Sequence, residues 1–199
     1  MKANKREIQR RIAYESARIL TEHRSDDQVF AVQKAATRLG ITDKRLMPNR
    51  EEVESALREQ QRLFRGNEQY NALMRLRHSA MQAMQALSHF KPILVGAVYE
   101  GTADSNSHVV LHLFSDTPEE VVFALSDLHI PWHERDRHMK FSDGSHKSMP
   151  SFRFTADGIL FELIVFPNKG SNNKPTDPLD NQPIQGAGIK QLEFILNQR

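Results

Sequence analysis

Residues 95–114, VGAVYEGTADSNSHVVLHLF, decide the fold of the second half of this chain. Gly96 marks a turn, a polar loop follows, and an apolar run from Val109 predicts a short strand. Successive side chains of a strand point to opposite faces of its sheet. The strand therefore presents Val109, Leu111 and Leu113 on one face, and His108, Val110 and His112 on the other.

Further strands and helices are predicted on both sides of this stretch. Residues 91–99 are a second strand, and residues 151–155 and 158–166 form a hairpin around the turn Ala-Asp-Gly. Thr117 and Pro118 open a short helix over 117–128, because these residue types favour the first positions of a helix. Residues 167–183 are predicted to be an irregular surface arm, and residues 189–196 a last helix.

The first 88 residues are predicted to be helical. Apolar residues at helical spacing indicate helices over about 4–22 and 25–40. Ser25 and Gln28 have the spacing of a capping box at the start of the second helix. A third helix is expected from the capping pair Asn49 and Glu52 to a break at Gly66, and a fourth over about 68–88.

We therefore predict an α+β protein, with a helical domain over residues 1–88 followed by an α/β domain over residues 89–199. The second domain is expected to hold a mixed β-sheet flanked by helices, with the arm and last helix at its end. Nine of the eleven phenylalanines lie after residue 88, which favours a second hydrophobic core there.

Composition narrows the class of protein. The 199 residues are 39% hydrophobic and 26% charged, as in an ordinary globular protein. No apolar run approaches the ~20 residues that cross a bilayer, and the first residues lack a secretory leader. We expect a cytoplasmic protein that does not contact the membrane. The chain has no cysteine, which excludes disulfides and thiolate metal sites.

Charge is distributed unevenly along the chain. Residues 1–88 hold 17 Lys/Arg and 11 Asp/Glu, a net charge of +6, whereas residues 89–199 hold 10 and 14, a net charge of −4. One interpretation is that the basic helices, through Arg10, Arg11 and Arg18, bind RNA, a protein partner or a second copy of the chain. The alternatives are that they form a solvated helical surface, or that the basic and acidic halves of the chain attract each other.

The stretch 95–114 resembles the DNA polymerase β-like nucleotidyltransferase superfamily, and its small bacterial members in particular. In that family a Gly-Ser turn is followed about ten residues later by Ser-Asp-Ile-Asp-Leu. Here Val95, Gly96 and Ala97 occupy the turn, residues 101–103 match an intervening Gly-Thr-Ala, and residues 107–111 are Ser-His-Val-Val-Leu. The resemblance covers roughly residues 90–166. It implies a nucleotidyltransferase-like sheet, with Glu162 at the place of a third carboxylate on a neighbouring strand.

The resemblance also implies a chemistry. The family's turn glycine lets the backbone approach a triphosphate, and the adjacent serine donates to a phosphate oxygen. Two carboxylates on one strand and a third beside them hold Mg²⁺ ions, which align the attacking hydroxyl with the α-phosphate. In this chain Ala97 replaces the serine, and His108 and Val110 replace the two strand carboxylates.

We therefore predict a catalytically degenerate nucleotidyltransferase-like protein, a pseudoenzyme, unless Asp104 or Asp116 replaces a lost ligand. Its cleft is expected to bind a nucleotide or nucleic acid. The predicted binding residues are Gly96, Ala97, Gly101, Thr102, Arg135 and Arg137.

Two alternatives concern the histidines and the arginines. His108, His112 and Glu162 have the composition of a two-histidine, one-carboxylate site, which could bind a divalent metal ion as the cofactor. With such a site the protein would be an active metal-dependent enzyme. The two histidines are otherwise polar residues lining a vacated cleft. Arg135 and Arg137 lie in a basic segment after Trp132 that suits phosphate and base contacts, or they decorate a surface where acidic residues alternate with them.

Overall fold

The computed structural model describes residues 2–23, 27–168 and 173–198. The chain divides into two compact units, one of residues 1–70 with 178–180 and one of residues 71–177 with 181–199. The division falls inside a helix, whereas the sequence predicted it at residue 88. Among the described helices, none is long and apolar enough to cross a membrane.

The first unit is helical, as predicted. It contains α1 (Lys2–His23), α2 (Gln28–Arg38), the 3₁₀ turn η1 (Lys44–Leu46) and the start of α3 (Arg50–Ala86). Ile12, Ile19 and Val32 are among the buried side chains of its core. Asp27 caps α2 by accepting a hydrogen bond from the backbone of Phe30, while the predicted cap Ser25 lies outside the described residues.

Helix α3 differs from the prediction, because it is one continuous helix rather than two. Its start is the predicted capping box, with Asn49 Oδ1 accepting from the Glu52 backbone and Glu52 accepting from the Asn49 backbone. The predicted break at Gly66 is wrong. A glycine inside a helix costs only about 1 kcal/mol relative to alanine, which is too little by itself to end a helix.

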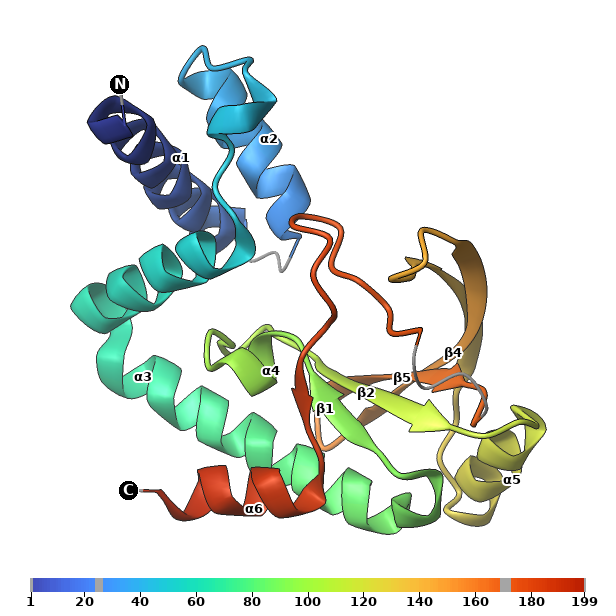
Figure 1. The fold of residues 1–199 in the computed structure, drawn as a ribbon. Coiled ribbons are helices and arrows are strands. Elements are labelled where there is room, and N and C mark those ends of the chain that lie inside the picture. The colour runs from blue at the N-terminus through green and yellow to red at the C-terminus, as the bar shows by residue number, and fades with distance from the viewer. Residues whose placement is uncertain (1, 24–26, 169–172, 199) are drawn as a thin grey trace. The chain divides into compact units, whose positions relative to one another are not determined.

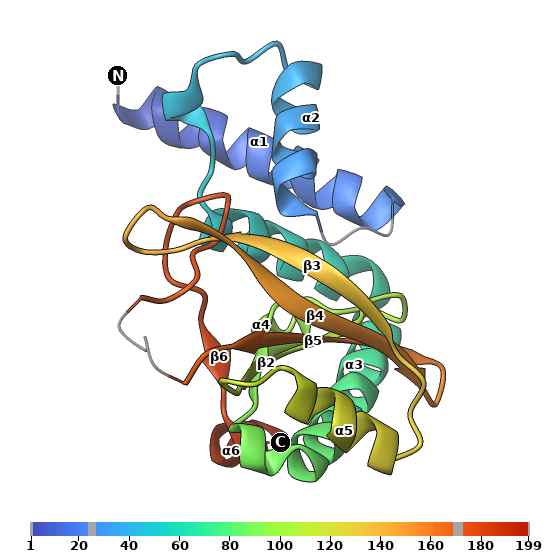
Figure 2. The ribbon, with the colours of Figure 1, turned by 90° about the vertical axis from the view of Figure 1, so that its right-hand side faces the viewer.

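The second unit holds a six-stranded mixed sheet in the order β3-β4-β5-β2-β1-β6 (Figures 1 and 2). Strands β2 and β5 are parallel, and the other neighbours are antiparallel. The strands are β1 (Ile93–Val95), β2 (Val109–Phe114), β3 (His133–Lys140), β4 (His146–Ala156), β5 (Ile159–Phe166) and β6 (Gly186–Ala187). The remaining elements are the 3₁₀ turn η2 (Ser88–Phe90) and helices α4 (Ala97–Glu100), α5 (Glu119–Asp127) and α6 (Ile189–Asn197).

One face of the sheet carries the main core of this unit. The C-terminal part of α3 lies against it together with α5 and α6 (Figure 1). The buried residues include Met84 of α3, Leu125 of α5, Leu192 of α6, and Leu111 and Leu163 of the sheet. Val109, Leu111 and Leu113 face this core, which confirms the direction predicted from the alternation.

The opposite face of the sheet holds a smaller apolar cluster of Phe141, Met149, Ile164 and Phe166. The arm predicted at 167–183 is mostly irregular in its described residues, 167–168 and 173–183, and it makes isolated bridges from Pro175 to Phe141 and from Thr176 to Pro183. The predicted hairpin is also present, and its turn residues Asp157 and Gly158 both have positive φ, as a two-residue turn between twisted strands requires.

Two predicted elements are shorter than expected or begin elsewhere. The strand predicted over 91–99 ends at Val95, because Gly96 takes a φ of 72° and the chain turns into α4. Strand β4 begins at His146, five residues before the strand predicted over 151–155.

Strand β6 was not predicted, and it depends on one glycine. A Cβ on Gly186 would lie 2.5 Å from the Ile93 side chain and 2.6 Å from the Leu94 carbonyl oxygen, whereas one on Gly188 would meet nothing within 4 Å. We expect Gly186→Ala to destabilise the second unit by about 1–3 kcal/mol and Gly188→Ala to leave it nearly unchanged. Urea unfolding followed by the fluorescence of Trp132, the single tryptophan, measures both. Equal stability of the two variants would contradict the close β1–β6 contact.

Candidate functional site

The candidate site lies on the sheet face opposite the helices. Strand register places Val110 of β2 opposite Glu162 of β5, Glu162 opposite Arg153 of β4, and Arg153 opposite His133 of β3. These four residues therefore form one row across four strands. His108 directly precedes β2 and is two residues from Val110, so it lies on the same side.

Glu162 is at the centre of this row, and its side chain is almost completely buried, with 1% of the residue exposed. Its Oε1 accepts hydrogen bonds from Arg153 Nε at 3.1 Å and Nη2 at 3.0 Å. Ser151 Oγ donates to the same oxygen at 3.2 Å. Three donors therefore converge on one carboxylate oxygen.

The second oxygen of Glu162 has a different environment. Oε2 is buried, and within the described part of the chain it accepts no hydrogen bond. His108 faces this oxygen, with its Nε2 3.7 Å away. This separation is that of an ion pair rather than a hydrogen bond, so a protonated imidazole would complete the neutralisation of the carboxylate.

The surrounding charges keep Glu162 ionised. Burial by itself raises the pKa of a carboxyl group, because it disfavours the charged form. The contact with His108 and the positive charges of Arg137 and Arg153 outweigh burial and lower the pKa of Glu162 to about 2. The site is therefore a buried carboxylate surrounded by cations.

His112 lies on the same face but has a structural environment. It is opposite Ile93 and Ile164 in the sheet, it is 6% exposed, and its ring packs against Phe166 with 4.7 Å between centroids. Burial lowers the pKa of His112 to about 4, although the charge of Glu162 acts in the opposite direction. His112 is therefore neutral at pH 7.

The predicted metal set of His108, His112 and Glu162 is not assembled. No three His, Asp or Glu side chains among residues 2–23, 27–168 and 173–198 are placed to hold a metal ion. The physical reason is that Arg153 and Ser151 occupy one oxygen of Glu162, while His112 is packed on Phe166.

The two carboxylates considered as replacements have local roles. Asp104 Oδ1 accepts a hydrogen bond from the Asn106 backbone at 2.9 Å. Asp116 Oδ1 accepts one from the Asn168 backbone, also at 2.9 Å. Asp104 thus stabilises a turn, whereas Asp116 ties the segment after β2 to the segment after β5, and neither lies opposite Glu162 in the sheet.

The predicted phosphate turn is a tightly closed backbone loop. Gly96 and Gly101 have φ values of 72° and 83°, and α4 lies between them. The backbone N–H groups of Thr102 and Ala103 both donate to the Ala97 carbonyl oxygen, at 3.0 and 3.1 Å. A Cβ on Gly96 would meet nothing within 4 Å, so this glycine is needed for its conformation and leaves open space beside the backbone.

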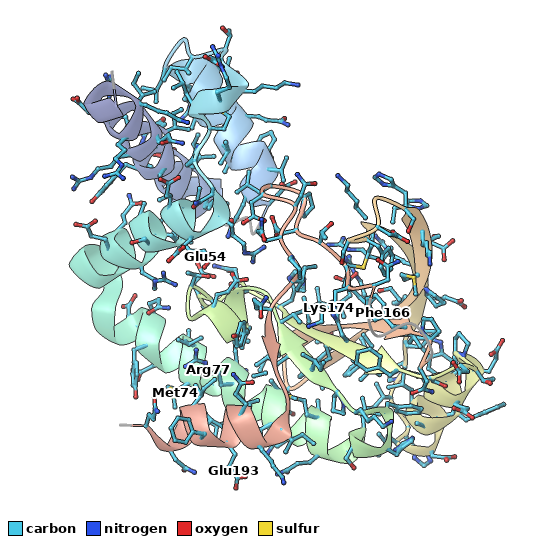
Figure 3. The ribbon with its side chains drawn as sticks, in the orientation of Figure 1. Glu54, Met74, Arg77, Phe166, Lys174 and Glu193 are labelled. Atoms are coloured by element: carbon cyan, nitrogen blue, oxygen red, sulfur yellow. The ribbon has the colours of Figure 1, made fainter. Side chains whose placement is uncertain are left out.

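The turn is joined to the sheet and to α3. Gly96 follows Val95, which lies opposite Val110 in register, so the turn adjoins the row that contains Glu162. Arg77 of α3 is labelled in Figure 3. It donates to the carbonyl oxygens of Val98 at 3.1 Å and Tyr99 at 3.2 Å. These bonds hold α4 in place.

The two predicted arginines lie on the same sheet face. Arg135 is opposite Ser151, and Arg137 is opposite Met149. Arg137 is close enough to Glu162 to lower the pKa of its carboxyl group. The structure thus brings Arg137, His108 and Glu162 together, while Arg135 lies one strand beyond Ser151.

Arg153 and Ser151 were missed in the sequence, although a signal for them existed. Glu162 lies within the apolar run of β5, and a buried carboxylate needs a cation or several donors. In Ser-Phe-Arg-Phe-Thr, residues 151–155, polar and aromatic residues alternate. The alternation places Ser151 and Arg153 on one face, where the hairpin register sets them beside Glu162.

The basic side chains of the first unit are partly engaged within it. Arg18 forms ion pairs with Glu15 and Glu22, both at 2.7 Å. Arg10 lies over the ring of Tyr14, 5.5 Å from its centroid. Part of the positive charge of α1 is therefore compensated locally.

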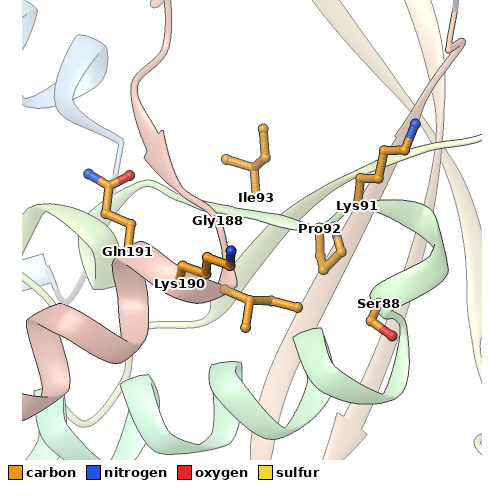
Figure 4. A pocket seen from close by; sticks show the side chains of 8 residues that line it. Ser88, Lys91, Pro92, Ile93, Gly188, Lys190 and Gln191 are labelled. Atoms are coloured by element: carbon orange, nitrogen blue, oxygen red, sulfur yellow. The ribbon is translucent and has the colours of Figure 1, made fainter.

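A hollow of about 430 Å³ lies elsewhere in the second unit (Figure 4). It is formed at the junction of η2, β1 and α6. None of the predicted site residues lines it. The lining residues are Ser88, Lys91, Pro92, Ile93, Gly188, Ile189, Lys190 and Gln191.

Comparison of the chain with protein-family models finds no match, and comparison with curated proteins finds none either.

Proposed function

We propose that this protein is a nucleotidyltransferase-like protein without two-metal chemistry, which binds a nucleotide or nucleic acid through fixed positive charges. The observation that carries the proposal is the ion pair between Glu162 and Arg153, opposite Val110. Where the resemblance leads us to expect three carboxylates and two Mg²⁺ ions, this chain has one carboxylate with an arginine bound to it. A guanidinium supplies positive charge but no Lewis acid.

The connections between the elements support the resemblance. The turn at Gly96 follows β1, the expected ligand positions lie at the start of β2, and Glu162 lies on the parallel neighbour β5. In the sheet, Glu162 and Val110 are direct neighbours. A carboxylate at Val110 would therefore have shared a metal with Glu162.

The same surroundings favour an anionic ligand. Arg153 is 28% exposed at its side chain and His108 also 28%, so both are accessible from the side of the row. Arg135 and Arg137 add two permanent charges on the same face. Arginine binds phosphate oxygens through a planar fork of donors, and such contacts need no metal ion.

We expect the purified protein to transfer no nucleotide. Labelled ATP, CTP, GTP and UTP would be incubated with it in Mg²⁺ or Mn²⁺, and the products separated from the unreacted nucleotide. The expected result is incorporation no greater than in a blank, because Val110 and His108 offer no carboxylate to a metal. Turnover that Glu162→Ala abolishes would overturn the proposed loss of catalysis.

Binding is tested separately by thermal unfolding with nucleoside triphosphates. A ligand at ten times its dissociation constant stabilises the folded state by about 1.4 kcal/mol. We expect the stabilisation to persist in the presence of a chelator, because the positive charges that bind the nucleotide belong to side chains and not to a metal ion. His108→Gln should weaken it, and Lys190→Gln, remote from the row, should not. If none of the four nucleotides changed the unfolding temperature, the proposed nucleotide site would be incorrect.

A further inference from the structure

The first five residues of strand β3 separate their charges by sign. In its sequence His-Glu-Arg-Asp-Arg-His-Met-Lys, basic and acidic residues alternate from position 133 to position 137. Ser151 and Arg153 both contact Glu162, and Arg135 and His133 lie opposite them in register. The face that contains Glu162 therefore receives His133, Arg135 and Arg137 and no acidic residue of β3. Glu134 and Asp136 point to the other face, together with His138 and Lys140.

These basic groups are available to a ligand. β3 is the outermost strand of the sheet (Figure 2), and residues 133–138 are all exposed. In the described part of the chain, the guanidinium groups of Arg135 and Arg137 form no ion pair within 4.0 Å. Their acidic neighbours in the sequence, Glu134 and Asp136, therefore form no ion pair with them, although Arg137 acts electrostatically on Glu162.

One more cation continues the line. Lys147 of β4 lies opposite Met139, and its Nζ is 5.2 Å from the centroid of the Phe141 ring. We name His133, Arg135, Arg137 and Lys147 the basic line. At about 3.3 Å per residue, the span from position 133 to position 139 is roughly 20 Å, with successive groups roughly 6.6 Å apart.

We propose that the basic line binds the backbone of a single-stranded nucleic acid. It is longer than the three linked phosphates of one nucleotide, and its spacing is comparable to that of successive phosphates in an extended strand. Partly buried Val110, Phe114 and Met139 are on the same face and offer apolar surface to bases. The inference rests on the proposed function for its phosphate ligand, and it names a strand rather than one nucleotide.

The test uses the full chain and two fluorescein-labelled 12-mers, one of uridine and one of deoxythymidine, with binding measured by anisotropy at several salt concentrations. Each phosphate contact contributes about −0.7 to the slope of log K against log salt for a single strand. We expect Arg135→Gln with Arg137→Gln to reduce the slope by about 1.4 and to weaken binding at least tenfold at low salt. The matched control, Lys91→Gln with Lys190→Gln, removes the same charge from the same unit and should change neither.

Each outcome decides the inference. Binding of both 12-mers, or of the uridine 12-mer alone, with loss in the arginine variant supports it, and the second result adds recognition of the 2′-hydroxyl. No binding at low salt, equal loss in both variants, or displacement by polyglutamate as effective as by unlabelled 12-mer overturns it. A thermal shift with UTP but no 12-mer binding would overturn the binding of single-stranded nucleic acid and leave the proposed nucleotide site in place. Binding of the 12-mer without a thermal shift for any nucleotide would overturn the nucleotide site and support the binding of a nucleic-acid strand.

Discussion

Replacing Arg153 by leucine should lower the free energy of unfolding of the second unit by about 3–5 kcal/mol, the cost of leaving a buried charge without its partner. Arg153 supplies two of the three hydrogen bonds to Glu162 Oε1. In its absence Glu162 stays buried, and its Oε2 already lacks a donor among the described residues. The measurement is urea unfolding followed by Trp132, which packs against the main core of this unit.

The double variant Arg153→Leu with Glu162→Leu separates the ion pair from simple packing. If the loss comes from an unpaired carboxylate, removing that carboxylate should recover most of the stability, since an apolar pair can replace a buried ion pair at little cost. Arg135→Leu is the control, because Arg135 is an exposed residue of β3 and should change stability by less than about 0.5 kcal/mol. An Arg153→Leu variant as stable as this control would show that the ion pair is not structural.

The pH dependence of the wild-type protein follows from the same carboxylate. The pKa of Glu162 is lowered from its ordinary 4.5 to about 2, so the unfolded chain binds this proton first. The stabilisation is fully present above pH 4.5 and is lost as the pH falls from there to about 2. Glu162→Gln should remove this part of the acid sensitivity.

Local sequence signals predicted most elements of the fold. Alternating residues gave β2 and the β4–β5 hairpin, and the pair Asn49 and Glu52 gave the start of α3. Gly66 misled, because a glycine signals a helix end only when the backbone takes a positive φ, and α3 continues through it. Strand β6 is two residues long, and its pairing with β1 depends on the close approach at Gly186, which no local pattern reports.

The candidate site was predicted less completely, because its contacts are nonlocal. The resemblance and the alternation of residues along the strand predicted that the site contains His108, Val110 and Glu162. The strand register places Val110 beside Glu162. The partner Arg153 is a property of the hairpin register, which decides which side chains meet. The charge separation on β3 likewise required knowing that residues 133–140 are a strand, because in a loop the alternating signs would cancel.

Lowering the pH from 6.5 to 4 should cost the second unit about 3 kcal/mol of stability through His112 alone, as about 2.5 pKa units at 1.36 kcal/mol each. His112 is buried, and its pKa falls from 6.5 to about 4, chiefly through burial. The unfolded chain therefore takes up the proton first as the pH falls. Stability is fully present above pH 6.5 and declines as the pH decreases to about 4.

The measurement is the free energy of unfolding by urea at several pH values between 4 and 7, followed by Trp132. His112→Leu preserves an apolar contact with Phe166 and removes the titrating group, so its stability should vary much less over this range. His146→Gln, an exposed residue at the start of β4, is the control and should retain the wild-type dependence. If His112→Leu kept the full pH dependence, His112 would be protonated without cost in the folded protein. Its ring would then have access to water or to an acceptor, and the neutral, buried role assigned to it against Phe166 would be incorrect.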